Sequence, residues 1–253
     1  MLKKLLILMV LTIPLMVSAG GGWPQAKGEG FFLLSQRLIA GNGYYNNNGM
    51  LIGSPMLAAY TTHFYGEYGI TDKFTGIIHT PFVTRLTRAE GVDGLGNIFT
   101  KDNATGFGDM DLALKYTIIE KPLYLSAEFT MGVPSGNYDA GETGSLHLGD
   151  GDFNQMLKIY ASRGFKYGFF ATVFGGFNNR TNGFSDEWHY GGELGIQQFG
   201  FTAIGKIYSR QSLFNELRKD SPIAGIYSDN LEYFSYSFQI LYTYKDKFGV
   251  MFE

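Results

Sequence analysis

The chain has 253 residues, of which 45% are hydrophobic, 16% aromatic and 17% charged, and its formal net charge is −3. The apolar and aromatic content excludes a disordered chain, and the absence of Cys excludes a disulfide scaffold and any Cys-ligated zinc or iron–sulfur site. The near-neutral charge does not fit a nucleic-acid-binding protein. We therefore expect a folded protein with no nucleic-acid partner.

The N-terminus has the pattern of a secretory signal peptide over residues 1–19. Lys3 and Lys4 supply the positive start, residues 5–17 form the apolar stretch, and small residues end it at Ala19. The alternative is an uncleaved anchor helix, but the apolar stretch is shorter than the ~20 residues that a spanning helix needs. We expect a mature domain over residues 20–253, which is exported either as a soluble protein or as a membrane barrel.

The rest of the chain alternates apolar and polar residues with a period of two, which predicts β-strands. In the clearest segment Phe234, Tyr236 and Phe238 share one face, and Ser235 and Ser237 share the other. In chain order, the expected strands cover residues 31–40, 57–68, 74–86, 106–118, 123–133, 153–162, 167–177, 187–198, 201–210 and 231–244, with a stub at 248–252.

The links between these strands differ in length in a regular way. Every second link is short, and the others are mostly long and polar. The short links are 69–73, 119–122, 163–166, 199–200 and 245–247, and the long ones are 41–56, 87–105, 134–152, 178–186 and 211–230. Short periplasmic turns and long extracellular loops are typical of outer-membrane barrels. The sequence therefore predicts an all-β, antiparallel transmembrane β-barrel of 10–12 strands in a Gram-negative outer membrane, in contact with membrane lipid and lipopolysaccharide.

If the aromatic face contacts lipid, the other face lines the lumen and is polar. The lumen-lining candidates are Arg37, His63, Glu67, His79, Arg85, Asp109, Asp111, Lys115, Glu128, Lys158, His189, Glu193, Lys206 and Arg210. The tight 199–200 turn predicts that Glu193 lies opposite Lys206, His189 opposite Arg210, and Gln197 opposite Thr202. Lys115 is expected opposite or diagonal to Glu128. These compensating charges indicate a lumen partly closed by ion pairs.

Several polar sets allow other chemistry. His63, His79 and Glu67 form a candidate zinc set, and the carboxylates of residues 139–152 form a candidate site for a divalent ion. Asp109 and Asp111 are spaced to share a proton. No nucleophile elbow or phosphate-binding loop is present, and ordinary lumen pairing accounts for these residues as well. We expect no catalytic residue, no metal and no cofactor.

Several motifs resemble those of outer-membrane transporter-type barrels grouped with the phenol meta-pathway degradation proteins. They are GWPQ at 22–25, KGEG at 27–30, YGEYGITD at 65–72, GFGD at 106–109, GDGDFNQ at 149–155 and GFNNR at 176–180. The resemblance implies a barrel of about twelve strands that passes small molecules, hydrophobic ones included. It brings no catalytic residues with it.

The leading hypothesis is a narrow, non-enzymatic channel or transporter for small-molecule solutes in the outer membrane. The alternatives are a barrel enzyme of lipase or protease type and a soluble exported β-sandwich binding module. Residues 20–28 are too few for a plug domain, so we expect any plug to come from loops or side chains. Because outer-membrane barrels have an even number of strands, the stub at 248–252 indicates either a chain lacking its last strand or a ten-stranded barrel.

Overall fold

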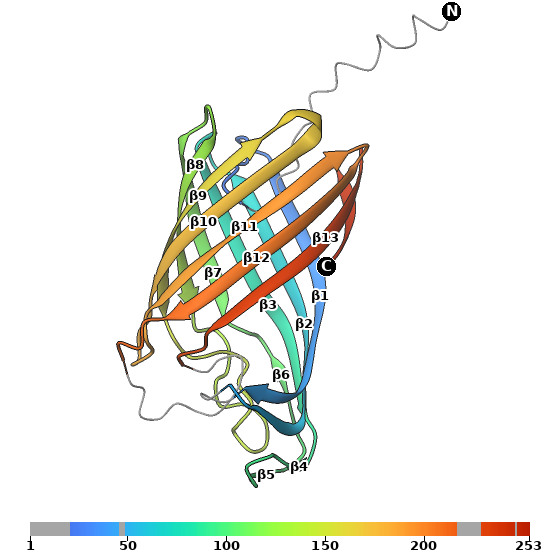
Figure 1. Cartoon of the computed structure of the whole chain (residues 1–253), viewed down its shortest axis with the longest axis vertical. Helices are drawn as coiled ribbons and strands as arrows, with labels where there is room; N and C mark the ends of the chain where they lie inside the picture. The colour runs from blue at the N-terminus through green and yellow to red at the C-terminus, as the bar shows by residue number, and fades with distance from the viewer. Residues whose placement is uncertain (1–20, 46–48, 217–228, 246) are drawn as a thin grey trace, which may run out of the picture.

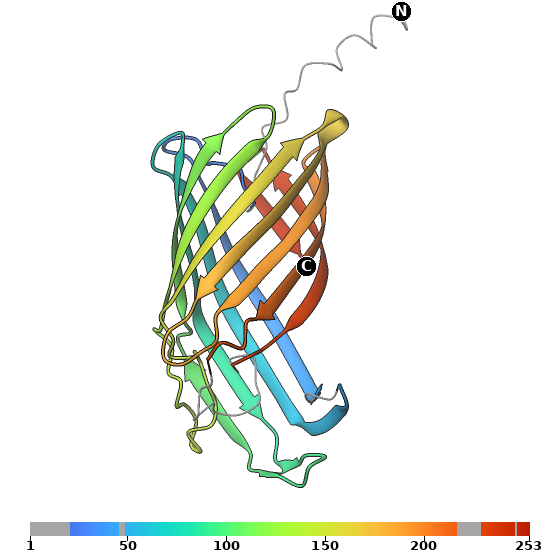
Figure 2. The ribbon, with the colours of Figure 1, turned by 60° about the vertical axis from the view of Figure 1, so that its left-hand side comes forward.

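The computed structural model describes all residues except 1–20, 46–48, 217–228 and 246. The described chain forms a 12-stranded antiparallel sheet that curls into a barrel (Figures 1 and 2). No helix in this part of the chain is long and apolar enough to cross a membrane. The expected all-β antiparallel fold is confirmed, and the single continuous sheet rules out a sandwich.

The strands of the wall follow one another in chain order, apart from a short interruption after β3. The long strands are β1 (Gly30–Tyr45), β2 (Leu51–Gly69), β3 (Phe74–Arg88), β7 (Met110–Ile119), β8 (Tyr124–Val133), β9 (Asn154–Gly164), β10 (Phe169–Asn179), β11 (Glu187–Gln198), β12 (Phe201–Ser212) and β13 (Tyr233–Tyr244), and β14 (Phe248–Phe252) ends the sheet. The short elements are β4 (Gly91–Val92), β5 (Ile98–Phe99), β6 (Asp102–Gly106) and the 3-10 turn η2 (Lys166–Gly168). Each predicted segment overlaps one of these long strands or β14, and β1, β2 and β3 extend beyond the predicted bounds.

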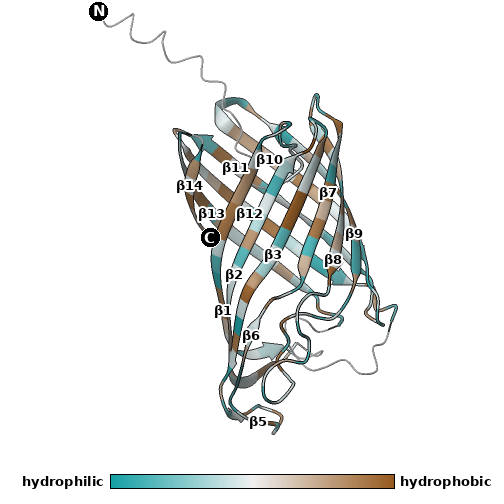
Figure 3. Ribbon diagram, turned by 180° about the vertical axis from the view of Figure 1, so that it is seen from behind, coloured by the Kyte–Doolittle hydropathy of each residue, from teal (hydrophilic) through white to brown (hydrophobic). Residues whose placement is uncertain are grey.

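Because consecutive wall strands pair antiparallel, all the short links lie at one end of the barrel, which we call the turn end. The long links lie at the other end, which we call the loop end. The two faces of the sheet differ as the alternation predicts. On β13 the outward Phe234, Tyr236 and Phe238 are 59–84% exposed, whereas the inward Gln239 and Leu241 are each 5% exposed. Brown and teal blocks alternate along the strands in Figure 3.

Two features of the wall differ from the predicted pattern. The short strand β6, which pairs with the loop-end half of β3, lies inside the segment expected to be a loop. A bulge at Phe82 on β3, opposite Thr62 and His63 of β2, shifts the register between the two strands, so that the side-chain parity of β3 changes beyond Pro81. Arg85 therefore points outward, opposite Tyr60, and its expected place in the lumen is wrong.

The edges of the sheet are β1 and β14. All five residues of β14 pair with β13, from Ile240↔Phe252 to Tyr244↔Phe248. β14 lies beside β1 in the barrel (Figures 1 and 3), and both strands run from the turn end toward the loop end. Within the described residues, no ladder pairs join these two strands.

Candidate functional site: the occupied lumen

A short N-terminal segment, residues 21–26, crosses the lumen at the turn end, and we call it the strap. At one side of the barrel, the Gly22 amide donates a hydrogen bond to Ser162 Oγ on β9 at 3.1 Å, and Ser126 Oγ on β8 donates to the Gly22 carbonyl at 2.6 Å. Both serines are buried. The strap is thus held by polar side chains that the barrel directs inward.

The other end of the strap is attached to the opposite part of the wall. The Gln25 amide donates to Thr75 Oγ1 on β3 at 3.0 Å, and its side chain donates to Glu67 Oε2 on β2 at 2.9 Å. The chain then leaves the lumen and is anchored where the Gly28 amide donates to the Gly69 carbonyl at 2.8 Å. Because its hydrogen bonds reach from β2 to β9, the strap extends across the lumen at the turn end.

The residue types of the strap follow from the space available to it. A Cβ atom at Gly22 would lie 2.7 Å from Tyr160 Cβ, and Gly21 has a φ of +78° and approaches the Glu193 carboxylate. Trp23 is 6% exposed and packs against Tyr124, with ring centroids 4.8 Å apart. The expectation that residues 20–28 contribute no plug is wrong: a segment this short fills the lumen because it is extended and rich in glycine.

Directly beside the strap lies a buried ion pair. Lys115 Nζ is 3.6 Å from Glu67 Oε2, and the two side chains are 1% and 0% exposed. Lys115 also donates to the Gly21 carbonyl at 2.9 Å, and the Tyr65 hydroxyl donates to Glu67. Each partner is therefore compensated by further hydrogen bonds, as a buried charge requires.

A second, largely buried pair lies beside the first on the inner face of the wall. Glu128 faces Lys115 on β7 and Lys158 on β9, and Lys158 Nζ donates to Glu128 Oε1 at 2.9 Å. Tyr160 and Thr130 also donate to this carboxylate, at 3.3 and 3.2 Å. The predicted Lys115–Glu128 register is observed, and these charges compensate one another along three neighbouring strands of the inner face.

The candidate zinc residues do not form a ligand set. His63 Nδ1 lies 3.1 Å from His79 Nε2 with the rings nearly parallel, and His79 Nδ1 lies 3.6 Å from Asp111. Glu67 is engaged with Lys115 instead. Within the described residues, no group of three or more His, Cys, Asp or Glu side chains is arranged to hold a metal ion.

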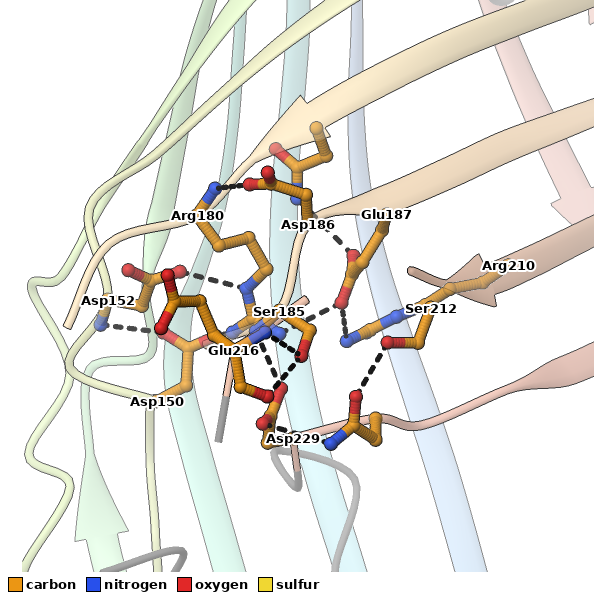
Figure 4. A network of polar contacts seen from close by, with 12 residues as sticks. Asp150, Asp152, Arg180, Ser185, Asp186, Glu187, Arg210, Ser212, Glu216 and Asp229 are labelled. Atoms are coloured by element: carbon orange, nitrogen blue, oxygen red, sulfur yellow. Dashed lines mark hydrogen bonds and ion pairs between the residues drawn. The ribbon is translucent and has the colours of Figure 1, made fainter. Parts of the chain in front are cut away.

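At the loop end, Arg180 organises a network of carboxylates (Figure 4). Its guanidinium donates to Asp150 at 2.7 Å, to Asp152 at 2.8 Å and to Glu187 at 2.9 Å, and its side chain is 3% exposed. Arg210 and His189 contact the same Glu187 carboxylate. Two of the carboxylates considered for a divalent ion, Asp150 and Asp152, are thus bound by a guanidinium.

The link 134–152 folds inward and caps the loop end. Asp109 accepts hydrogen bonds from the amides of Gly136 at 2.8 Å and Asp150 at 2.7 Å. Leu146 and Leu148 pack, together with Ala140, against Leu86 and Ala104 on the inner face of the wall. Asp109 therefore anchors this cap through backbone amides, and it does not share a proton with Asp111.

The remaining candidates lie as follows. The register places Glu193 opposite Lys206, His189 opposite Arg210, and Gln197 opposite Thr202, as the turn length predicts. Arg37 lies opposite the buried Thr61, on the inner face of the exposed edge strand β1. Sequence reasoning named Arg180 only as the last residue of the GFNNR motif at 176–180 and assigned it no role.

One solved structure is informative for this geometry. An outer membrane channel from Pseudomonas putida F1 superposes with a TM-score of 0.66, over 93% of this chain and 90% of that one, at 16% identity. The chain shares the barrel fold of that channel. The expected resemblance to outer-membrane transporter-type barrels is thereby confirmed at the level of the fold. No protein-family model and no curated protein matches the chain.

Proposed function

We propose that this protein is an outer-membrane channel for small molecules, exported with a signal peptide that is removed after residue 19. The cleavage site itself lies outside the described residues. The observation that carries the proposal is a barrel with an apolar outer face and a polar inner face, whose lumen holds a thin strap where a soluble barrel would hold a packed apolar core. Recovery of the protein in the outer-membrane fraction tests the location, and recovery in the soluble fraction contradicts it.

The lumen favours uncharged solutes over ions. Its charged side chains are paired with one another, as in Glu67 with Lys115 and Glu128 with Lys158, whereas a pore selective for ions of one sign shows an excess of the other sign. Near the edges of the sheet the inner face carries apolar side chains. They include Leu33 on β1, which lies opposite Tyr65 of β2, and Leu241 on β13. We therefore include small hydrophobic molecules among the solutes.

We propose further that the protein is not an enzyme. The side chains considered for hydrolysis are already engaged: His189 contacts Glu187 at 2.8 Å and also Tyr208, and Asp109 binds two backbone amides. The assay is hydrolysis of phospholipid and of a peptide library by the purified protein. Turnover that is lost on His189→Ala contradicts this part of the proposal.

The proposed membrane contact makes a prediction for the outer face. Phe238 lies at the middle of β13 and is 59% exposed. We expect Phe238→Arg to lower the free energy of unfolding from lipid vesicles by about 2–4 kcal/mol, because a guanidinium at the bilayer midplane is poorly solvated. Phe234→Arg, near the loop end on the same outward face of β13, is the matched control, with an expected loss of about 0–1 kcal/mol. Equal losses of unfolding free energy in urea titrations of the two variants would contradict a bilayer midplane at the level of Phe238.

A further inference from the structure

A row of aromatic side chains crosses the inner face of the wall from β9 to β13. Successive ring centroids lie 5.5, 6.1 and 5.7 Å apart, and the planes of neighbouring rings differ by 33–36°. The members of this row, which we call the aromatic row, are Tyr160 on β9, Phe174 on β10, Tyr208 on β12 and Tyr233 on β13. The five strands lie side by side (Figure 1), so the rings form one continuous surface.

The row is continuous across β11 because that strand contributes a glycine at this level. Gly191 pairs with Phe174 on one side and with Tyr208 on the other. A Cβ atom at Gly191 would lie 2.9 Å from the Phe174 ring, so a side chain here would separate the two rings. At the other end of the row, the Tyr160 hydroxyl donates to Glu128 at 3.3 Å and fixes that ring. A surface held in this way binds a ligand at a smaller cost in ordering.

The aromatic row leads from the loop end of the lumen to the strap. Tyr233, the first residue of β13, lies at the loop end and is 41% exposed. Phe174 and Tyr208 are half-buried, and because the wall covers their outer side, the exposed part of each ring faces the lumen. Tyr160 is 8% exposed and lies beside Gly22 of the strap. A solute that enters at the loop end therefore meets these rings before it meets the strap.

Hydrogen-bonding side chains flank the aromatic row on both sides. On the turn-end side, the register aligns one polar residue from each strand: Ser162, Thr172, Glu193, Lys206 and Ser237. On the loop-end side, it aligns Lys158, His189 and Arg210. A carboxylate has about four acceptor sites and an ammonium has three donors. Glu193 and Lys206, which lie opposite each other, thus retain hydrogen-bonding capacity beyond their own pairing.

Rings flanked by polar groups match the surface of a sugar. The two faces of a pyranose ring consist largely of C–H groups, which pack against aromatic rings, and its hydroxyl groups project around the edge. A purely apolar solute would cover the same rings, but it would displace water from Glu193 and Lys206 and offer them no hydrogen bond, which costs free energy. Neutral hydroxyl groups offer both donors and acceptors to these side chains.

We propose that the aromatic row is a binding track for neutral sugars on the wall of the lumen. The sugar rings pack against the aromatic rings, and the two flanking sets of polar side chains bind the hydroxyl groups. This inference rests on the proposed function, because it names one class of uncharged solute for the channel.

The absence of Cys from the chain provides a direct test. Ser235 lies opposite Tyr208 and is exposed, so Ser235→Cys places a single thiol beside the aromatic row. Its alkylation by a water-soluble maleimide is followed in vesicle-reconstituted protein, with maltose, cellobiose or lactose as the probe. We expect at least one of these neutral disaccharides to slow alkylation at least five-fold at saturation.

Two further probes and one further thiol serve as controls. Benzyl alcohol has an aromatic ring without a rim of hydroxyl groups, and glycerol has hydroxyl groups without a ring, so we expect neither to slow alkylation at the same concentrations. Gly41→Cys places the thiol near the loop end of β1, away from the row, where a Cβ atom meets nothing within 4 Å. We expect the sugars to leave its alkylation unchanged.

Two substitutions at Tyr233 examine the row itself in the Ser235→Cys protein. Tyr233→Leu removes an exposed ring, and we expect it to raise the sugar concentration that gives half-protection at least five-fold. Tyr233→Phe keeps the ring and should retain the protection. Heat-modifiable migration on a gel establishes that each variant is folded.

The inference is overturned if none of the three disaccharides protects folded Ser235→Cys protein, or if Tyr233→Leu leaves the protection unchanged. Equal protection by benzyl alcohol, or of Gly41→Cys, would also overturn it. Conductance of the same protein is recorded separately. Protection without conductance leaves the sugar site standing and removes the channel, whereas conductance without protection removes the sugar site alone.

Discussion

Gly22→Leu should expel the strap from the lumen and bring Trp23 into contact with water. Even the first side-chain atom of a residue at this position would lie 2.7 Å from Tyr160 Cβ and 2.8 Å from Ser162 Oγ. Overpacking of this kind costs about 1–3 kcal/mol, and each hydrogen bond that holds the strap contributes only about 0.5–1.5 kcal/mol. The clash is comparable in cost with the two hydrogen bonds of Gly22 together. We expect the strap around Trp23 to move, because the surrounding wall is a continuous hydrogen-bonded sheet.

Tryptophan fluorescence measures this displacement. The chain has 2 Trp, and Trp188→Phe removes the outward one, which is 49% exposed. In that background we expect iodide to quench Trp23 weakly in the parent protein and several-fold more strongly after Gly22→Leu. Gly53→Leu is the matched control, because a Cβ atom there meets nothing within 4 Å. Equal quenching in the parent and Gly22→Leu proteins would show that the strap does not depend on a small residue.

Arg180→Met should release the loop-end cap while the barrel stays folded. The substitution removes the only guanidinium that binds both Asp150 and Asp152 among the described ion pairs, and Asp152 is fully buried. Removing one partner of a buried pair costs about 3–5 kcal/mol, because the remaining charge has neither water nor counter-charge. Arg180 also lies 3.9 Å from the centre of the Phe184 ring, a contact that is lost at the same time.

Limited proteolysis separates the cap from the barrel. We expect chymotrypsin to cleave Arg180→Met at Tyr138 or Leu146 at least ten-fold faster than the parent, with unchanged heat-modifiable migration of the barrel. Arg180→Lys should restore little of the parent's resistance to cleavage, since an ammonium lacks the planar guanidinium that contacts three carboxylates. Arg163→Met, which removes an exposed arginine from β9, is the control. Cleavage of Arg180→Met at the parent rate would show that the network does not hold the cap.

Strand positions and register were predictable because they depend on local alternation and turn length. The two-residue turn at Phe199 and Gly200, both with positive φ, fixes the pairing of β11 with β12, so Glu193 opposite Lys206 follows from counting. The same counting fails across a bulge. The extra residue at Phe82 reverses the orientation of Arg85, and nothing in the alternation marks it.

The closing elements of the lumen were not predictable in the same way, because they depend on contacts between residues far apart in sequence. Gly22 contacts Ser162 across 140 residues, and Arg180 joins a carboxylate of the link 134–152 to Glu187 on β11. The motif GWPQ at 22–25 and the preceding Gly21 hold the features that place the strap: the two glycines allow a close approach to the wall, and Trp23 packs against Tyr124. The buried charges beside it were recognised as compensating, but their role in binding the strap was not.

If the protein is a channel, the strap closes it. Single-channel recording in planar bilayers measures this closure. The parent protein and a variant lacking residues 21–26 are refolded, checked by heat-modifiable migration and recorded under the same conditions. We predict that the parent gives no steps or very small ones, and that the deletion variant gives discrete steps several-fold larger. Folded protein with the same conductance in both forms would contradict the claim that the strap closes the lumen.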